Sequence, residues 1–129
     1  MDKVVHFEIP FDHKERAHKF YKNVFGWGLI DMPEMNYTIV HTVEIDKENN
    51  NMPKEAGAIN GGMYKRDANS AQGPVIVIDV ADLDEKIKMV EAAGGHVIKG
   101  KVKVGDMGWY AQVKDTEGNI IGLWEQIKK

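Results

Sequence analysis

The stretch Asp115–Glu125 has the sequence DTEGNIIGLWE, which is typical of a turn that leads into a strand. Gly118 and Asn119 tolerate the positive φ that a hairpin turn requires. Side chains alternate between faces along a strand, so Gly122 and Trp124 share one face. A glycine inside a strand is typical of a place where another group approaches the backbone closely. The stretch predicts a hairpin whose last strand offers a concave surface for a small molecule, although a packing glycine in an ordinary hairpin explains the same residues.

The composition indicates a single globular domain. With 129 residues, 43% of them hydrophobic, the chain is long enough for one compact domain. Its net charge of −3 is spread along the sequence, without the basic stripe of a nucleic-acid-binding protein. No apolar run has membrane-spanning length, and the first residues do not resemble a signal peptide. The absence of cysteine excludes disulfides and cysteine nucleophiles. We expect a soluble, cytoplasmic protein that binds neither nucleic acid nor membrane.

The first half of the chain predicts a strand, a helix and further strands. Residues Val4–Ile9 alternate between apolar and polar side chains, as in a strand with one apolar face. Asp12 and Glu15 have the spacing of a capping box, and Gly26 predicts the end of the helix that follows. The expected buried stripe of this helix consists of Ala17, Phe20, Tyr21 and Val24. Further strands are predicted over 37–45 and 58–64, with an exposed loop over 47–55 between them.

The second half repeats this order. Residues Val75–Val80 predict a strand that is buried on both faces. Asp82 and Glu85 form a second capping-box pattern, and Gly94 predicts the end of the second helix. Strands are then predicted over 96–98, 108–114 and from 120 onward. An offset of 69 residues aligns the halves, which predicts one domain, 1–129, with two modules, 1–66 and 74–129, and a polar linker over 67–73.

Two motifs resemble the vicinal oxygen chelate (VOC) superfamily. They are FYKNVFGW at Phe20–Trp27, at the end of the first helix, and DTEGN at Asp115–Asn119, before the last strand. This superfamily includes glyoxalase I, bleomycin-resistance proteins and extradiol dioxygenases, and the similarity covers essentially the whole chain. The resemblance implies an α+β fold in which paired βαβββ modules form a cupped mixed sheet. It also implies a glyoxalase-like protein that binds a small molecule in the cavity of this sheet.

The resemblance implies four metal-ligand positions, one on each of four strands. In metal-dependent members these positions carry His, Glu or Gln. His6 stands at the first position, whereas the second falls within residues 58–64, which contain no imidazole or carboxylate. The third and fourth positions fall at Val75 and Gly122, which cannot coordinate. Because three of the four positions lack a coordinating side chain, we expect no metal and no other cofactor.

A divalent metal at an atypical site remains an alternative. Glu8 shares a strand face with His6, and His41 or a partner chain would complete such a site. Without a metal, His6 and Glu8 are candidates for a general base or a polar anchor, because a nearby carboxylate raises the pKa of an imidazole. The same two residues also fit an ordinary polar strand face.

Five further residues are candidates for ligand binding. The aromatic side chains offer flat surfaces for an aromatic or sugar-bearing ligand, and the glycines leave room where the family's ligands would be bulky. These residues are Gly62, Trp109, Tyr110, Gly122 and Trp124. Simple core packing is the alternative explanation for the aromatic residues.

Two classes of function follow. The first is a metal-free binding protein of the bleomycin-resistance type, which holds a small organic molecule without converting it. The second is a divalent-metal-dependent lyase, isomerase or dioxygenase, similar to lactoylglutathione lyase, with an atypical site around His6 and Glu8. An assembly module with a vestigial cavity is a third possibility. By analogy with the superfamily we also expect a homodimer.

Overall fold

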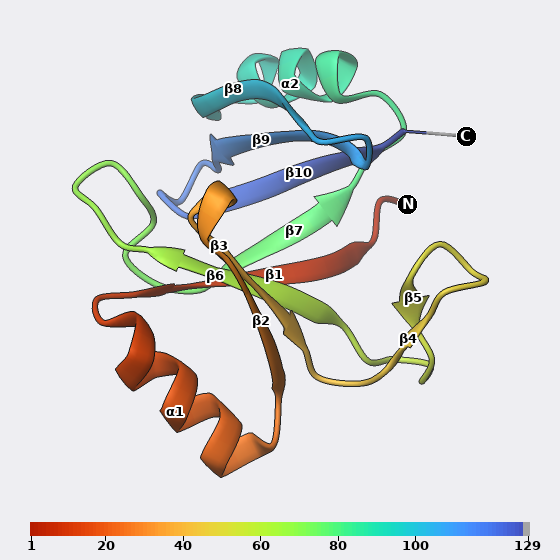
Figure 1. Ribbon diagram of the computed structural model, residues 1–129. Coiled ribbons are helices and arrows are strands. Elements are labelled where there is room, and N and C mark those ends of the chain that lie inside the picture. The colour runs from red at the N-terminus through yellow and green to blue at the C-terminus, as the bar shows by residue number, and fades with distance from the viewer. Residues whose placement is uncertain (128–129) are drawn as a thin grey trace. The chain divides into compact units, whose positions relative to one another are not determined.

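The computed structural model describes residues 1–127, which divide into two compact units (Figure 1). We call His6–Pro74 the first unit. The second unit combines Met1–Val5 with the chain from Val75 onward. The first five residues therefore lie outside the unit that contains most of the 1–66 module. Asp79 donates its backbone N–H to the Lys3 carbonyl at 2.9 Å, which holds this segment in the second unit.

The helices and strands follow the order strand, helix, strands in each unit. In the first unit they are β1 (Val4–Phe11, of which Val4 and Val5 belong to the second unit), α1 (Lys14–Phe25), β2 (Gly28–Met32), a 3-10 turn η1 (Pro33–Met35), β3 (Tyr37–His41), β4 (Ile45–Asp46), β5 (Met52–Pro53) and β6 (Asn60–Lys65). In the second unit they are β7 (Val75–Asp79), α2 (Leu83–Ala92), β8 (His96–Val104), β9 (Gly108–Lys114) and β10 (Ile120–Gln126).

Both units have the same strand arrangement, which confirms the α+β fold and the βαβββ modules. In the first unit the strand order is β2-β3-β6-β1, with β1 and β6 parallel and the other pairs antiparallel. In the second the order is β8-β9-β10-β7, with β7 and β10 parallel. Glu8 pairs with Gly62, and Val77, which is 69 residues beyond Glu8, pairs with Gly122. The register thus agrees with the offset that aligns the two halves of the sequence.

The hairpin of the second unit forms as its sequence predicts. β9 and β10 pair in antiparallel register from Gly108 with Gln126 to Lys114 with Ile120. In the turn between them, Asp115 Oδ1 accepts the backbone N–H groups of Glu117 and Asn119 at 2.8 Å each. Gly118 supplies the positive φ, at +86°.

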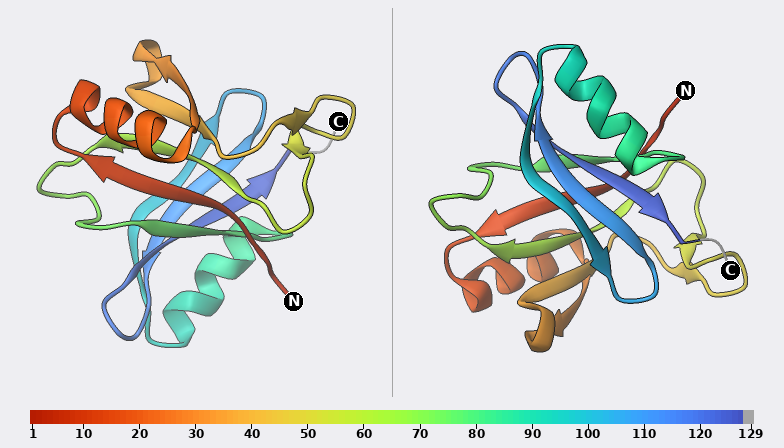
Figure 2. Two further views of the ribbon diagram at one scale, coloured as in Figure 1. Left: turned by 90° about the horizontal axis from the view of Figure 1, so that it is seen from below. Right: turned by 90° about the horizontal axis from the view of Figure 1, so that it is seen from above.

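Helix α2 covers one face of β8, β9 and β10 (Figure 2). Asp82 caps this helix as predicted, since its Oδ1 accepts the Glu85 N–H at 3.1 Å. The buried residues beneath α2 are Val80, Leu83, Ala111, Val113 and Leu123. On the same face, Glu125 Oε1 accepts the Leu83 N–H at 2.7 Å. Leu123 and Glu125 therefore face the helix, and Gly122 and Trp124 lie on the opposite face.

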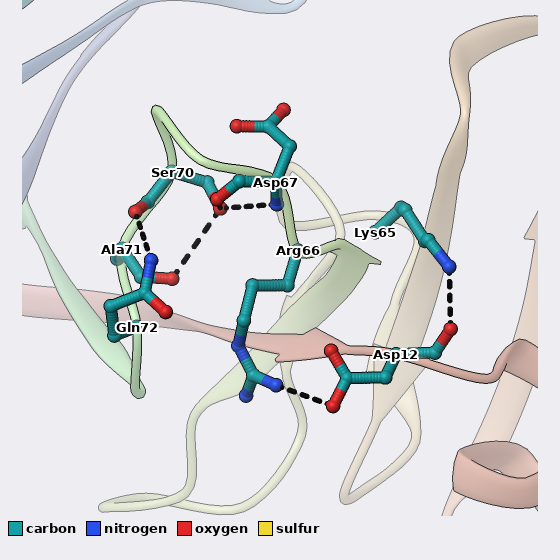
Figure 3. A network of polar contacts seen from close by, with 7 residues as sticks. All are labelled: Asp12, Lys65, Arg66, Asp67, Ser70, Ala71 and Gln72. Carbon is teal, nitrogen blue, oxygen red and sulfur yellow. Dashed lines mark hydrogen bonds and ion pairs between the residues drawn. The ribbon is translucent and has the colours of Figure 1, made fainter.

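Helix α1 differs from its prediction at the N-terminus. The N-cap is His13, which makes no side-chain capping bond, so the predicted Asp12 cap is wrong. The Asp12 carboxylate instead pairs with Arg66 Nη1 at 2.7 Å, and its carbonyl accepts Lys65 Nζ at 2.6 Å (Figure 3). These partners from β6 and beyond hold Asp12 away from the helix. Gly26 ends α1 as predicted, with φ of +71°.

Several predicted extents and burials also need correction. The strand predicted over 37–45 ends at His41, and the strand predicted over 96–98 continues to Val104. The loop predicted over 47–55 contains β5, which pairs with β4 just before the loop. Val75 and Val77 are buried, but Ile76 between them is 47% exposed, so β7 is not buried on both faces. In the predicted stripe of α1, Phe20 and Val24 are more than half exposed.

The polar segment after β6 is an ordered turn (Figure 3). Ser70 Oγ accepts the Asp67 N–H at 2.9 Å, and Asp67 Oδ1 accepts the Asn69 N–H at 2.7 Å. Gln72 Nε2 donates to the Ser70 carbonyl at 3.1 Å.

Neither helix within residues 1–127 has the length and apolar composition needed to cross a membrane.

The two candidate caps give a matched test. We expect Asp82→Ala to lower the free energy of unfolding by about 1 kcal/mol, because it removes a capping bond. Asp12→Ala removes only an exposed ion pair and should change stability by less than about 0.5 kcal/mol. Urea unfolding followed by circular dichroism measures both values. An Asp12→Ala cost equal to that of Asp82→Ala would contradict the assignment of His13 as the N-cap.

Candidate functional site

A tyrosine joins the two predicted catalytic residues. His6 and Glu8 alternate along β1 and therefore lie on one sheet face. Tyr37, the first residue of β3, reaches this face, and its Oη lies 3.0 Å from Glu8 Oε2 and 3.2 Å from His6 Nε2. Glu8 is only 7% exposed. The structure thus brings His6 and Glu8 together through a hydroxyl group.

The opposite face of this sheet carries helix α1. Thr38 follows Tyr37 and points the other way, where its Oγ1 lies 2.8 Å from His18 Nε2 on α1. Trp27 stacks on Tyr21 at 4.9 Å between ring centroids and packs near Phe7. The His6–Glu8–Tyr37 face is therefore the face that α1 leaves uncovered.

Gly62 lies directly beneath the Tyr37 side chain. On β6 it pairs with Glu8 on one side and with Ile39 on the other. A Cβ atom built at Gly62 would overlap the Tyr37 hydroxyl and ring. The expectation that Gly62 leaves open space is therefore wrong, because Tyr37 fills that space. Only a residue without a side chain allows Tyr37 to reach Glu8.

The hydrogen-bond directions follow from the chemistry of the three groups. A carboxylate only accepts, so Tyr37 donates its hydroxyl proton to Glu8. The Tyr37 oxygen then accepts from His6, which places the imidazole proton on Nε2. Burial lowers the pKa of His6 from 6.5 to about 4, so the ring is neutral at pH 7. The expectation that the neighbouring carboxylate raises this pKa is wrong, because burial of the imidazole shifts it in the opposite direction.

Two buried polar groups on the same face have unused hydrogen-bonding capacity. Asn60 pairs with His6 in the sheet, and its Oδ1 accepts the backbone N–H of Thr42 at 2.8 Å. Its Nδ2 is buried without a partner, and the buried Tyr64 hydroxyl has no acceptor for its proton, although the Ala71 backbone N–H approaches its oxygen. Burial, followed by the charge of Glu8, raises the pKa of Tyr64, with partial compensation from the Ala71 backbone and Arg66. The Tyr64 hydroxyl therefore keeps its proton available for an acceptor.

In the second unit, Tyr110 lies over Gly122. The Tyr110 Oη accepts Gln112 Nε2 at 2.8 Å. A Cβ atom at Gly122 would lie 3.0 Å from the Tyr110 Oη and 3.0 Å from Val77 Cγ2. The space above Gly122 is therefore already in use. Trp124 shares this strand face and covers Gly108 with its ring.

Trp109 lies apart from Tyr110, Gly122 and Trp124. Its side chain is on the face of α2, where it packs against the buried cluster beneath that helix. Lys101 Nζ lies 4.6 Å from the centroid of its ring, a cation–π contact. The structure therefore separates Trp109 from the other predicted ligand-binding residues of this unit.

The residues present do not fit the four-ligand metal site of the superfamily. Within residues 1–127, no three His, Cys, Asp or Glu side chains lie close enough together to hold a metal ion. His41 accordingly forms no such group with His6 and Glu8. The position of Gly62 is covered by a tyrosine hydroxyl, and Val75 offers no donor atom.

Sequence reasoning missed Tyr37. It stands 29 residues from Glu8, at the start of a strand whose pairing partners cannot be read from local patterns. The available signal was Gly62 itself, because a strand glycine implies that a neighbouring group approaches closely.

Comparison with known proteins agrees with this fold. Residues 3–42 match the family described as bleomycin resistance protein-like N-terminal. The chain is 30% identical over 120 residues to "Putative glyoxylase CFP32" of Mycobacterium bovis and to the protein of the same name in Mycobacterium tuberculosis. These matches cover 92% of this chain and 43% of the relatives. The chain therefore spans less than half the length of the curated relatives it matches.

Solved structures of low sequence identity share the fold over nearly the whole chain. A hypothetical protein from Bacillus halodurans C-125 has a TM-score of 0.65 at 16% identity, covering 99% of this chain and 96% of its own. A glyoxalase/bleomycin resistance protein/dioxygenase superfamily member from Vibrio splendidus 12B01 has a TM-score of 0.62 at 13% identity, with coverages of 98% and 100%. Methylmalonyl-CoA epimerase from Mycobacterium tuberculosis has 0.61 at 16%, with 97% and 88%. This chain belongs to the VOC superfamily, and its relatives are glyoxalase-like and bleomycin-resistance-like proteins.

The buried imidazole makes a pH-dependent contribution to stability. Because the folded state lowers the pKa of His6 from 6.5 to about 4, the unfolded state binds the proton more readily. Stability is therefore full above pH 6.5 and decreases as the pH falls toward 4, by up to about 3 kcal/mol. NMR titration of the histidine ring signals measures the pKa, and urea unfolding between pH 7 and 4 measures the loss.

A matched pair of variants assigns this effect to His6. His6→Gln should flatten the pH dependence of unfolding, whereas His96→Gln, at an exposed position on β8, should leave it as in the wild type. A His6 ring signal that titrates at pH 6.5 or above would contradict the burial argument.

Proposed function

We propose that this chain binds a small organic molecule on the β1–β6–β3 face that carries His6, Glu8 and Tyr37, without using a metal ion. The observation that carries the proposal is the pair of buried donors without an acceptor on this face, Asn60 Nδ2 and the Tyr64 hydroxyl. Buried polar groups are normally hydrogen-bonded, and leaving one unpaired costs about 1–3 kcal/mol. A ligand with acceptor atoms would satisfy both groups.

The spacing of these groups supports an organic molecule rather than an ion. Asn60 and Tyr64 are four residues apart on β6, which corresponds to about 13 Å along a strand. Between them, the His6–Tyr37–Glu8 network offers further polar atoms. This array suits a compound with several carbonyl or carboxyl oxygens. The dedicated ligand set that a metal-dependent lyase, isomerase or dioxygenase of this superfamily requires is not matched by the described residues.

The proposal includes a cytoplasmic location and a homodimer. An apolar surface on α1 supports self-association, because Phe20, Val24 and Phe25 are each more than half exposed, and the rings of Phe20 and Phe25 lie 6.2 Å apart. Exposed apolar patches often mark protein–protein contacts. For the whole protein we propose ligand binding and no further activity.

The Tyr64 hydroxyl gives the sharpest test of ligand binding. A library of small carboxylates and amides would be screened by ligand-observed NMR, and hits measured by calorimetry with and without EDTA. We expect Tyr64→Phe to weaken binding by about 3- to 10-fold, the value of one hydrogen bond, while leaving the free protein as stable or more stable. Tyr21→Phe, on the α1 face of the same unit, should leave affinity unchanged.

Two results would contradict the proposal. One is binding that disappears on addition of EDTA and returns with a divalent metal, which would favour the metal-dependent alternative. The other is equal affinity of the Tyr64→Phe and wild-type proteins for every hit.

Self-association is tested separately. Light scattering coupled to gel filtration should give twice the chain mass of 14.5 kDa. Phe20→Glu should shift the protein to a monomer, because it introduces a charge into the apolar surface of α1. A wild-type protein that elutes as a monomer at millimolar concentration would remove the dimer from the proposal.

A further inference from the structure

We infer that Tyr37 keeps divalent metal ions off the His6–Glu8 face, with its hydroxyl in the place that an ion would occupy between the imidazole and the carboxylate. Tyr37 and Gly62 act as an interlocked pair in this role, because Tyr37 can take this position only while residue 62 has no side chain. The inference concerns metal exclusion and does not depend on which organic molecule, if any, the face binds.

Two side chains of the types that commonly bind metal ions converge on one oxygen atom. His6 Nε2 and Glu8 Oε2 lie 3.2 Å and 3.0 Å from the Tyr37 Oη. An ion bound by the same two atoms would sit about 2.0–2.2 Å from each, in the region that this oxygen fills. The hydroxyl donates to the carboxylate and accepts from the imidazole, so it satisfies both groups without a positive charge.

Tyr37 also excludes a third metal ligand from this face. Gly62 pairs with Glu8 and lies on the same sheet face, so any side chain there would point toward the network. A Cβ atom at Gly62 would overlap the Tyr37 side chain. A coordinating residue at this position and Tyr37 are therefore mutually exclusive. A metal-binding side chain at position 62 therefore requires a change at both Gly62 and Tyr37.

The second unit supplies an independent instance of the same pair. Tyr37 stands two residues before Ile39, which pairs with Gly62, and Tyr110 stands two residues before Gln112, which pairs with Gly122. A Cβ atom at Gly122 would lie 3.0 Å from the Tyr110 Oη. Val77 takes the place that Glu8 has in the first unit, as the strand neighbour of the glycine. Tyr110 accepts a hydrogen bond from Gln112.

The repetition argues against coincidence. The two units have little sequence identity, yet each places a tyrosine over a glycine at the same register. These glycines stand at, or next to, the positions where the superfamily resemblance implies a metal ligand. A tyrosine in place of a ligand is thus a repeated feature of this chain.

Cobalt binding tests the inference directly. Co²⁺ is the probe, because its visible absorption reports the number and type of its ligands. We expect wild type to show no stoichiometric binding. Tyr37→Phe should bind Co²⁺ only weakly, because it vacates the place of the hydroxyl between His6 and Glu8 while its ring still excludes a third ligand at position 62. The double variant Tyr37→Ala, Gly62→His combines His6, Glu8 and a new imidazole, the facial set of two histidines and one carboxylate. It should bind one Co²⁺ at least about 100-fold more tightly than wild type.

A control shows which residues hold the ion. Adding His6→Ala to the double variant should abolish Co²⁺ binding. Stoichiometric Co²⁺ on the wild type, or a folded double variant that binds no better than wild type, would overturn the inference.

A second measurement decides the matter if the double variant does not fold. Gly62→Ala in the wild type should lower Tm by more than about 5 °C, because the methyl group overlaps Tyr37. In a Tyr37→Ala background the same change should cost little or raise Tm. Gly73→Ala, where an added Cβ meets nothing within 4 Å, is the matched control. An equal loss of Tm from Gly62→Ala with and without Tyr37 would overturn the interlocked pair.

Discussion

The hydrogen bond from the Tyr37 hydroxyl to Glu8, made across Gly62, is the interaction on which the candidate site depends. It determines the tautomer of His6, keeps a buried carboxylate solvated by protein groups, and explains the glycine in β6. Buried charges persist only when they are paired or hydrogen-bonded, so removing the tyrosine would leave Glu8 with one hydrogen bond fewer. Each unit has the βαβββ arrangement of the superfamily, but the side chains on the His6–Glu8–Tyr37 face differ from the ligand set of its metal-dependent members.

Local rules were sufficient where the deciding contacts are close in sequence. The 115–119 turn depends on Asp115 and Gly118, and the cap of α2 depends on Asp82 three residues before Glu85. Both features were predictable because neighbouring backbone groups satisfy them. The Asp12 cap failed for the opposite reason. Its carboxylate finds Arg66, which is 54 residues away in the sequence.

In the candidate site, too, features that depend on nearby residues were predictable and those that depend on distant residues were not. Alternation along β1 was enough to place His6 and Glu8 together, and the resemblance was enough to mark residues 58–64 and Gly122 as lacking a metal ligand. The filling of those positions was not predictable, because Tyr37 and Tyr110 arrive on different strands whose register is set by the whole sheet. The pKa of His6 was also out of reach, since it depends on burial rather than on the adjacent carboxylate.

The central claim is that this member of the VOC superfamily functions without a bound metal. Elemental analysis of the protein, purified without chelator or affinity tag, tests it most directly. The account predicts well below one equivalent of nickel, zinc, manganese and iron per chain, also after dialysis against each ion. One equivalent of any of them per chain would contradict it and would direct attention to His6 and Glu8 as ligands.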